Sequence, residues 1–438
     1  MSEEELLAAA AQDGNLAWIL VSAALVLFMT PGLAFFYGGM DRSRNVLNML
    51  MMNFWCLLII PVVWVLFGYS LAQTPFENDF IGNFDNAFLK NLDLSDGGTT
   101  LAVLAFLGMF AVITPALISG AVADRMKFSA WAIFAPVWLI LVFVPVFKWV
   151  YGGWFSQGVI SDEGGSIDFA GGTAIHVNAG IAALACVLVL GKRKGWPSEG
   201  HPPHSMPLVM LGTGILWFGW FGFNAGSALA ANGQAVQAFL NTFLAAAAAG
   251  LAWAVVERIR DGHFTNLGAA SGIVAGLVAI TPCAGFVAGM APIYIGLIAG
   301  VVCCFAVGIK TKLGYDDALD VVGVHFVGGL TGSLLLGLFA DPAYFEGAFL
   351  EGLFLGGGAD LLIEQVIANV VTIVYSFVVT GLIMLALKAT IGVRVSEEVE
   401  DAGLDLAEHS ETAYHDSPGY QVSDTGTASA APAPSATV

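Results

Sequence analysis

The stretch Gly172-Thr-Ala-Ile-His176-Val-Asn-Ala-Gly180 puts a histidine in the middle of a long apolar run. His325 lies in a similar frame from Val321 to Gly329, in which valine takes the place of the first glycine. A titratable side chain inside a membrane-spanning helix is costly, and it normally faces a pore or a buried partner. Two such helices with one imidazole each predict a duplicated pore in an all-α integral membrane protein.

The composition supports a membrane protein. Of the 438 residues, 57% are hydrophobic and 11% are charged, whereas a soluble domain carries about 25% charged residues. The net charge of −19 argues against nucleic acid as a partner. The five cysteines fall in or beside apolar segments, and their spacing matches no metal motif. We therefore expect packed thiols, with neither a metal nor a cofactor.

Apolar runs of about 20 residues mark membrane-spanning helices. Eleven are predicted, at 16–39, 49–72, 99–123, 130–150, 170–190, 207–230, 236–256, 266–282, 288–308, 321–340 and 361–387. The resulting organisation is an extracellular segment 1–15, a membrane domain 16–388, a cytoplasmic region 389–420 and a disordered, Ser/Thr/Ala/Pro-rich tail 421–438.

The distribution of lysine and arginine predicts the orientation. All of the basic residues except Lys90 and Lys148 fall in loops on one side of the eleven spans or in the C-terminal segment. The positive-inside rule places this side in the cytoplasm. The N-terminus is therefore predicted outside and the C-terminus inside.

The two histidine helices are the fifth and the tenth, so they run in opposite directions. His176 lies near the outer end of its helix, and His325 lies near the inner end of its own. Helices 1–5 and 6–10 are therefore predicted to form an inverted repeat with a site near the midplane, where the two imidazoles would approach each other.

Several motifs resemble those of the ammonium transporter family (Amt/Mep/Rh), and they lean to the Amt side. They are Asp168-Phe-Ala-Gly-Gly-Thr-Ala-Ile-His176-Val-Asn-Ala-Gly180, Gly219-Trp-Phe-Gly-Phe-Asn-Ala-Gly-Ser227, Asp320-Val-Val-Gly-Val-His325, Gly32-Leu-Ala-Phe-Phe-Tyr-Gly-Gly39 and Ala123-Asp-Arg-Met-Lys-Phe-Ser129. The resemblance extends to about Tyr414. It implies a homotrimer with a separate pore through each subunit.

The resemblance also implies roles for two pairs of residues in the pore. His176 and His325 match twin pore histidines, and Phe110 and Phe223 match a stacked aromatic gate. An imidazole can donate from one nitrogen and accept at the other, so paired rings can hydrogen-bond NH3 or relay a proton. The alternative for the histidines is packing against backbone carbonyls. The alternative for the phenylalanines is core packing, in a chain with 31 of them.

Four residues match an outer site that recruits NH4+: Ser227, Tyr151, Asp168 and Trp220. Helix packing is the alternative for Ser227, and an N-cap is the alternative for Asp168. Trp220 is assigned because it neighbours the gate.

Tyr151 is a departure from the family pattern. It stands where the family commonly has tryptophan, whose ring face attracts a cation more strongly. Trp149 or Trp154 is the alternative contributor to this aromatic site.

The function that the resemblance implies is an ammonium transporter or channel of the cell membrane. It would recruit NH4+, remove a proton and conduct NH3, with or without separate proton transfer. The segment from Gly392 to Tyr414 resembles a cytoplasmic region that stabilises the trimer and couples it to a PII-type regulatory protein.

Other classes of protein remain as alternatives to an ammonium transporter. The alternatives are an Rh-like channel for NH3 or CO2 and an ammonium sensor that signals through the tail. An ion-coupled transporter is disfavoured because no acid lies in mid-span. An enzyme is disfavoured because the sequence contains no nucleophile–base pair and no metal cluster.

Overall fold

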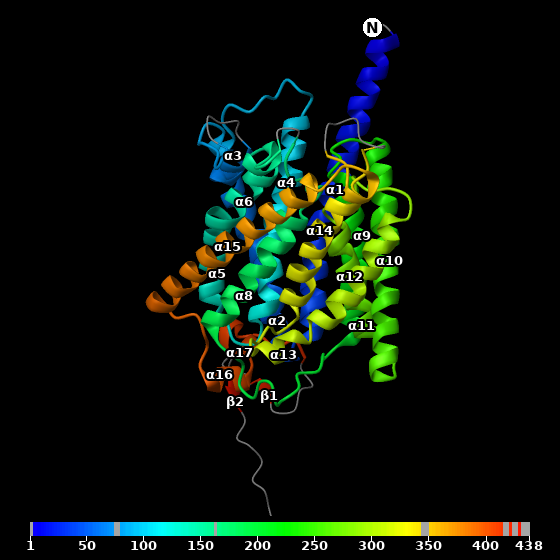
Figure 1. Ribbon diagram of the computed structural model, residues 1–438. Coiled ribbons are helices and arrows are strands. Elements are labelled where there is room, and N and C mark those ends of the chain that lie inside the picture. Colours follow the sequence, from blue (N-terminus) through cyan, green and yellow to red (C-terminus); the bar gives the residue numbers. More distant parts are fainter. Residues whose placement is uncertain are drawn as a thin grey trace, which may run out of the picture.

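The computed structural model is a bundle of long helices that run between two opposite ends (Figure 1). It describes residues 3–73, 79–161, 164–342, 350–414, 420–422 and 428–430. Ten of the helices in these ranges are long and apolar enough to cross a membrane. The predicted class, a helical protein with many membrane spans, is therefore confirmed.

The long helical stretches are α1 (Glu3–Met40), α2–η1–α3 (Val46–Val63, Trp64–Gly68, Tyr69–Gln73), α4 (Thr99–Val122), α5–η3–α6 (Phe128–Trp138, Leu139–Phe143, Val144–Val150), η4–α8 (Gly172–Val177, Asn178–Leu190), α9 (Met206–Gly226), α10 (Gly233–Asp261), α11 (Asn266–Ile280), α12 and α13 (Ala291–Ala306, Ile309–Leu313), η5–α14 (Val322–Phe326, Val327–Phe339) and α15 (Asp360–Thr390). Shorter elements are η2 (Ala87–Leu89), α7 (Trp154–Gln157), η7 (Leu353–Leu355), α16 (Glu397–Ala402) and α17 (Leu404–His409). Strands β1 (Tyr420–Val422) and β2 (Ala428–Ala430) pair as an antiparallel ribbon.

All eleven predicted runs contain a helix, but one of them is short. The run predicted at 266–282 is the 15-residue α11, which does not reach the length of the other ten. It ends at Ile280, two residues before Pro282, which has no backbone N–H with which to continue the helical hydrogen bonds. Eleven spans and the orientation of the bundle remain predictions.

The segments that carry the two histidines cross at close range. A side-chain carbon at Gly180 would lie 2.6 Å from the Cα of Phe326, and one at Gly329 would lie 2.9 Å from the Cβ of His176. Glycine is required at both crossings because the backbones approach so closely. Each glycine follows its histidine by four residues. The repeated His-x3-Gly spacing therefore places a glycine where the two histidine helices cross.

The first helices of the two predicted halves also lie side by side. α1 packs along α9, and η4–α8 packs against η5–α14. In the numbering of the predicted spans these are helix 1 against helix 6 and helix 5 against helix 10. Like elements meet in this way when two halves are related by an axis that passes between them.

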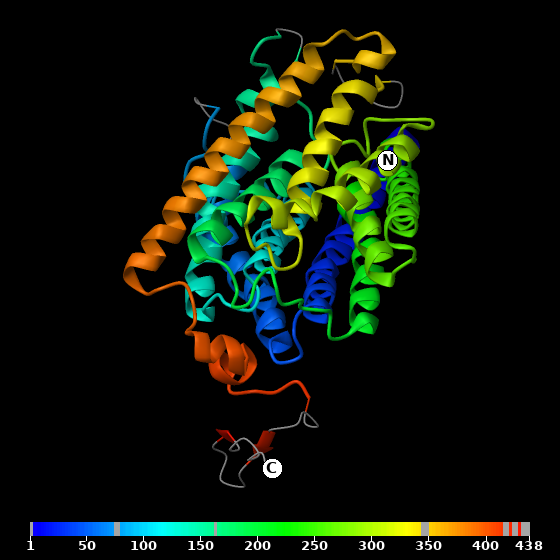
Figure 2. The ribbon, with the colours of Figure 1, turned by 60° about the horizontal axis from the view of Figure 1, so that its bottom comes forward.

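The C-terminal region packs onto one end of the bundle (Figure 2). Val395 donates its backbone N–H to the carbonyl of Arg125, and Asp405 accepts from the backbone N–H of Asn48. The Glu400 carboxylate accepts from the backbone N–H of Lys194. The segment from Val395 to α17 is thus tied to two loops and to the first turn of α2, at the end that is rich in lysine and arginine. The boundaries predicted at residues 15, 388 and 420 stay predictions, and most of the predicted tail lies outside the described residues.

Candidate functional site

The two imidazoles meet in the centre of the bundle. Nδ1 of His176 and Nδ1 of His325 are 3.3 Å apart, and the rings are nearly parallel with centroids 5.3 Å apart. Both side chains are buried. Because a hydrogen bond between two ring nitrogens needs one donor and one acceptor, one ring carries its proton on Nδ1 and the other on Nε2. The pair therefore presents one Nε2 acceptor and one Nε2–H donor to its surroundings.

The outer neighbour of the pair is Trp220. Its ring stacks on His176 with centroids 5.4 Å apart, and its indole N–H donates to the hydroxyl of Thr281 at 2.9 Å. Nε2 of His176 is buried and has no hydrogen-bond partner among the described side and main chains. This nitrogen is the polar atom that a small molecule beside the ring can use.

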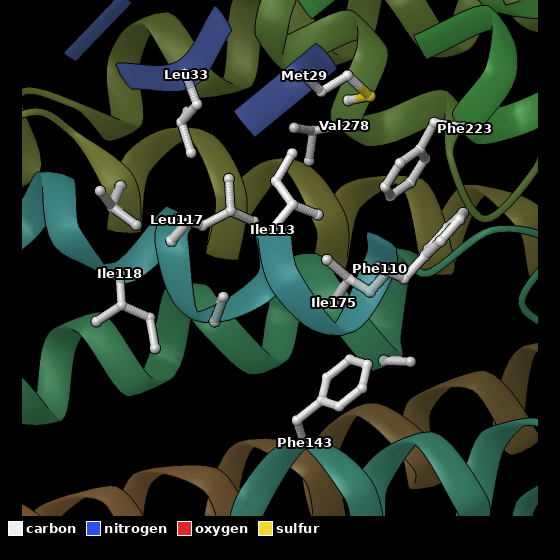
Figure 3. Packing of buried hydrophobic residues seen from close by; sticks show 14 of the residues in the cluster. Met29, Leu33, Phe110, Ile113, Leu117, Ile118, Phe143, Ile175, Phe223 and Val278 are labelled. Atoms are coloured by element: carbon white, nitrogen blue, oxygen red, sulfur yellow. The ribbon is translucent and has the colours of Figure 1, made fainter. Parts of the chain in front are cut away.

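Beside the histidines lies a narrow, apolar lumen. Its lining residues are Met29, Leu33, Phe36, Ile113, Leu117, Ile175, His176, Leu216, Trp220, Phe223, Val274 and His325. Figure 3 shows part of this wall, with Met29 and Leu33 of α1 opposite Ile113 and Leu117 of α4. The cavity volume is ≈ 10 Å³, which is about the room that one water-sized molecule needs. Two histidines are the only ionisable side chains among these lining residues, so an ion in the lumen would find few ligands.

A stacked aromatic pair closes the end of the lumen that is predicted to face outward, which is called the outer end. The rings of Phe110 and Phe223 are 4.2 Å apart and nearly parallel, and both side chains are buried. Phe110 lines an outer cavity while Phe223 lines the lumen. The pair therefore separates the two spaces, as a gate would.

The outer cavity has a volume of ≈ 260 Å³ and is mostly aromatic. It is lined by Gln73, Val103, Phe106, Leu107, Phe110, Phe147, Tyr151, Phe169, Ser227 and Leu229. Aromatic ring faces attract a cation. The hydroxyl of Ser227 donates to the carbonyl of Phe223 at 2.8 Å, so its oxygen lone pairs remain available to a donor in the cavity.

Asp168 does not line this cavity. One carboxylate oxygen accepts from the backbone N–H groups of Gly171 and Gly172, and the other accepts from those of Thr173 and Ala174. The side chain is buried and caps η4, the π-helical turn that carries His176. The N-cap alternative thus describes its contacts, and the next residue, Phe169, supplies the cavity wall.

Asp317 occupies the equivalent place in the second half, which the sequence analysis missed. Its carboxylate accepts from the backbone N–H of Val322 at 2.7 Å, at the start of η5, which carries His325. Asp317 precedes His325 by eight residues, as Asp168 precedes His176. The repeated Asp-x7-His spacing was the signal that could have found it.

Three aromatic assignments change with the structure. Trp220 lines the lumen below the gate rather than the outer cavity. The indole of Trp149 donates to the carbonyl of Phe80, and Trp154 packs on Phe80 and Trp149, so neither lines the outer cavity. Tyr151 does line it. The rings that sequence reasoning missed there are Phe106, Phe147 and Phe169.

A charged cavity lies at the C-terminal end of α1 and is called the inner cavity, after the side that it is predicted to face. Its volume is ≈ 220 Å³, and it is surrounded by charged side chains from the segments that follow α1, α4 and α8 and from residues 310–320. Asp124 accepts from Arg42 and from Arg193, each at 2.9 Å, and Arg193 also pairs with Asp316 at 2.8 Å. Burial lowers the pKa of the neighbouring Arg125 to about 10, although Asp316 opposes this shift. These ion pairs lock the inner loops to one another.

No group of three or more His, Cys, Asp or Glu side chains in the described ranges is placed to hold a metal ion. The five cysteines are buried and free.

Comparison with known proteins matches this architecture. The model of the Ammonium Transporter Family fits residues 17–414. The chain belongs to the ammonium transporter family. An ammonium transporter of Mycobacterium tuberculosis is 50% identical in a 434-residue alignment, which covers 92% of this chain and 90% of the relative. One of Bacillus subtilis is 46% identical over 413 residues, 93% of this chain and 100% of the relative.

Solved structures of ammonium transporter family proteins share the fold. The crystal structure of Candida albicans Mep2 superposes with a TM-score of 0.82 at 32% identity and covers 88% of this chain and 87% of its own. A structure described as a sensor Amt protein gives 0.84 at 30% identity and covers 92% of this chain and 99% of its own. This chain is therefore similar both to a protein named as a sensor and to proteins named as transporters.

Proposed function

We propose that the chain is an ammonium channel that takes up NH4+ from an outer site, removes its proton and passes NH3 past the twin histidines. The observation that carries the proposal is the pair of imidazoles in contact at the wall of an apolar lumen with room for about one water-sized molecule. A neutral molecule can enter such a space, whereas an ion would lose its hydration shell and gain few ligands.

Recruitment begins in the outer cavity. NH4+ is attracted by the ring faces around Tyr151 and Phe106, and it donates a hydrogen bond to the oxygen of Ser227. K+ is attracted by the same rings but has no proton to give up. The channel therefore selects NH4+ over K+ at the step at which the cation must lose its charge to pass Phe110 and Phe223.

The histidine pair acts on the neutral molecule. NH3 donates to the imidazole nitrogen that lacks a proton and accepts from the Nε2–H of the other ring. Asp168 and Asp317 hold the two turns that aim these rings, and they do so without contact to the permeant. These two hydrogen bonds replace part of the hydrogen bonding that NH3 loses when it leaves water.

The outer cavity is proposed to face the extracellular side of the plasma membrane. The support is the gathering of lysine and arginine at the opposite end, where α16 and α17 also lie. Cysteine labelling from each side of sealed vesicles tests this. A cysteine introduced at exposed Asp401, beside Lys194, should react only from the cytoplasmic side.

The decisive test is a flux assay in proteoliposomes. Uptake of ammonium should exceed uptake of K+ by several orders of magnitude, and His176→Ala or His325→Ala should abolish the preference. Recording the current during uptake then separates neutral NH3 passage from joint movement of NH3 and H+. Wild-type flux in both alanine variants would remove the site assignment.

An ammonium sensor is the second candidate, because one similar solved structure is described as a sensor Amt protein. Binding of ammonium without measurable uptake would favour it. An Rh-like NH3 or CO2 channel would instead show uptake that is insensitive to changes in the outer aromatic site.

A homotrimer and a PII-type partner are proposed on separate grounds. An apolar groove of ≈ 480 Å³ lies between Trp18 of α1 and Val236, Phe239 and Leu240 of α10, and these α10 side chains are exposed in the single chain. Native mass spectrometry should show three subunits. Co-purification with a PII protein and nucleotide should depend on the docked segment from α16 to Tyr414.

A further inference from the structure

The inner cavity continues the face of α1 that lines the lumen. Met29, Leu33 and Phe36 line the lumen, and Met40, one turn further, lines the inner cavity. These positions follow the spacing of one helix face. Asp41, the residue after α1, is therefore at the place where a molecule that leaves the lumen enters the inner cavity.

Asp41 is a buried acid with an unused oxygen. Only 2% of its surface is exposed, yet it lines the cavity. Oδ1 accepts from the backbone N–H of Arg42 at 2.7 Å. Oδ2 receives no donor from any of the described residues. Such an oxygen is costly to bury as an anion and is accommodated when it carries a proton.

The neighbour of Asp41 explains where that proton resides. Asp124 lies close enough to Asp41 for its charge to act on the Asp41 carboxyl group. Asp124 accepts from Arg42 and Arg193 at 2.9 Å each and is therefore the anion. Burial, and then the charge of Asp124, raise the pKa of Asp41 well above its ordinary value. Asp41 consequently holds the proton.

The remaining charges around the cavity are already paired or lie at its rim. Lys310 pairs with Asp320 at 2.7 Å, and Arg193 pairs with Asp316 as well as with Asp124. Glu199 is exposed, and the Nε2 of His201 has no partner in the described ranges. His204 faces Asp41 through its Nδ1, which is 2.8 Å from the Asp41 carbonyl oxygen. While Asp41 is protonated, the lining anions Asp124, Glu199 and Asp320 balance the lining cations Arg42, Arg193 and Lys310. Once Asp41 gives up its proton, the lining carries an excess negative charge, which favours a small cation beside it.

We propose that Asp41 is a proton-exchange and ammonium-binding group at the inner mouth of the pore, a role that rests on the proposed conduction of NH3. The lone pair of an arriving NH3 takes the proton from the Asp41 carboxyl group. The O–H bond breaks, an N–H bond forms, and NH4+ remains beside the Asp41 carboxylate. NH4+ then leaves, and a proton from the inner solution restores the acid. Each cycle converts one NH3 and one inner proton to one NH4+.

The test is infrared difference spectroscopy of the full-length protein in lipid nanodiscs, where both faces are open to the buffer. Perfusion with ammonium chloride should remove a carboxylic-acid C=O band, and perfusion with potassium chloride should leave it. The band should be absent from Asp41→Asn, which is nearly isosteric and keeps a side-chain oxygen that can accept from the backbone N–H of Arg42. It should persist in Glu199→Gln, which alters an exposed acid of the same cavity.

Three results would overturn the proposal: no carboxylic-acid band that Asp41→Asn removes, a band that ammonium does not change, or a band that K+ removes equally. Thermal unfolding and size-exclusion profiles of Asp41→Asn show whether it is folded. If it is not, the same band followed by pH titration of the wild type decides, since the buried acid should lose it only well above the ordinary range of aspartate. Ammonium uptake by the wild type in proteoliposomes, measured in parallel, shows whether a negative result belongs to Asp41 alone or to the proposed function.

Discussion

Replacing Gly180 by alanine tests whether the close crossing of the two histidine helices positions the imidazoles. The added carbon would lie 2.6 Å from the Cα of Phe326, whereas ordinary contact begins at 3.4 Å. The backbone N of Phe326 would be closer still, so the two backbones must separate by roughly 1 Å. The obstacle is main chain rather than a flexible side chain. Phe326 directly follows His325, so the shift is transmitted to the ring. The Nδ1–Nδ1 distance would grow from 3.3 Å to roughly 4 Å, beyond hydrogen-bonding range.

The expected result for Gly180→Ala is a loss of about 1–3 kcal/mol of stability and a ten- to hundred-fold loss of ammonium uptake, because displacements of about 1 Å cost about that much at an active site. Uptake in proteoliposomes and thermal unfolding measure the two effects. Gly214→Ala in α9 is the matched control, since its added carbon meets nothing within 4 Å while the gain in helix propensity is the same. Gly180→Ala protein that transports and unfolds like the control would refute the argument.

Three further changes have defined outcomes. Asp168→Asn replaces two of the four acceptor contacts with an amide N–H2 group facing backbone donors, so the protein should lose about 2–4 kcal/mol of stability and most of its uptake; calorimetry that finds it as stable as wild type contradicts this. Ser227→Ala should raise the half-saturating ammonium concentration about fivefold, the equivalent of one hydrogen bond of about 1 kcal/mol, with an unchanged maximal rate; a lower maximal rate at unchanged half-saturation would place Ser227 in conduction instead. Burial lowers the pKa of His409 below its ordinary 6.5, so below that pH the undocked tail binds a proton first and docking weakens as the pH falls from about 7.5 to 5.5. Hydrogen exchange of the α16–α17 amides should accelerate over this interval, and His409→Asn should remove the dependence.

The membrane class and the meeting of the histidines were predictable because each rests on a pattern that is local in sequence. A run of about 20 apolar residues predicts a membrane-spanning helix. Two imidazoles in opposed helices meet if the halves are related by an axis between them. Asp317 was predictable on the same ground and was missed because the motif was taken to begin at Asp320, three residues too late.

The walls of the outer cavity were not predictable in the same way. Phe106 and Phe147 have no local feature that distinguishes them from the other phenylalanines of the chain, and only packing decides which of these rings faces a space. Trp149 and Tyr151 are two residues apart, so they point in directions about 200° apart on a helix. By sequence, either residue could contribute its ring to the outer cavity. In the structure Tyr151, the residue that follows α6, lines the cavity and Trp149 does not.

The charged inner cavity needed the fold for a different reason. Arg42, Asp124, Arg193 and Asp316 come from four separate segments, and each alone looks like an ordinary loop charge. Their pairing is visible only when the loops meet. The arginines among these residues contribute to the excess of positive charge that predicts the orientation, but that excess does not indicate which acid each of them pairs with.

The contact between the imidazoles also bears on how a proton could accompany NH3. A proton that enters at the free Nε2 of one ring can leave from the Nε2 of the other only if the Nδ1–H···Nδ1 bond inverts, because each ring holds one proton on its two nitrogens. After one passage both tautomers are reversed, and the next proton in the same direction requires the bond to be turned back. Ammonia needs no such reset, since it leaves the tautomers as it found them. Proton passage through the pair must therefore include a step that ammonia passage lacks. As the ammonium gradient is increased, the current should saturate before the flux of nitrogen does. Equal saturation of current and flux would mean that the proton takes a path that does not run through this bond.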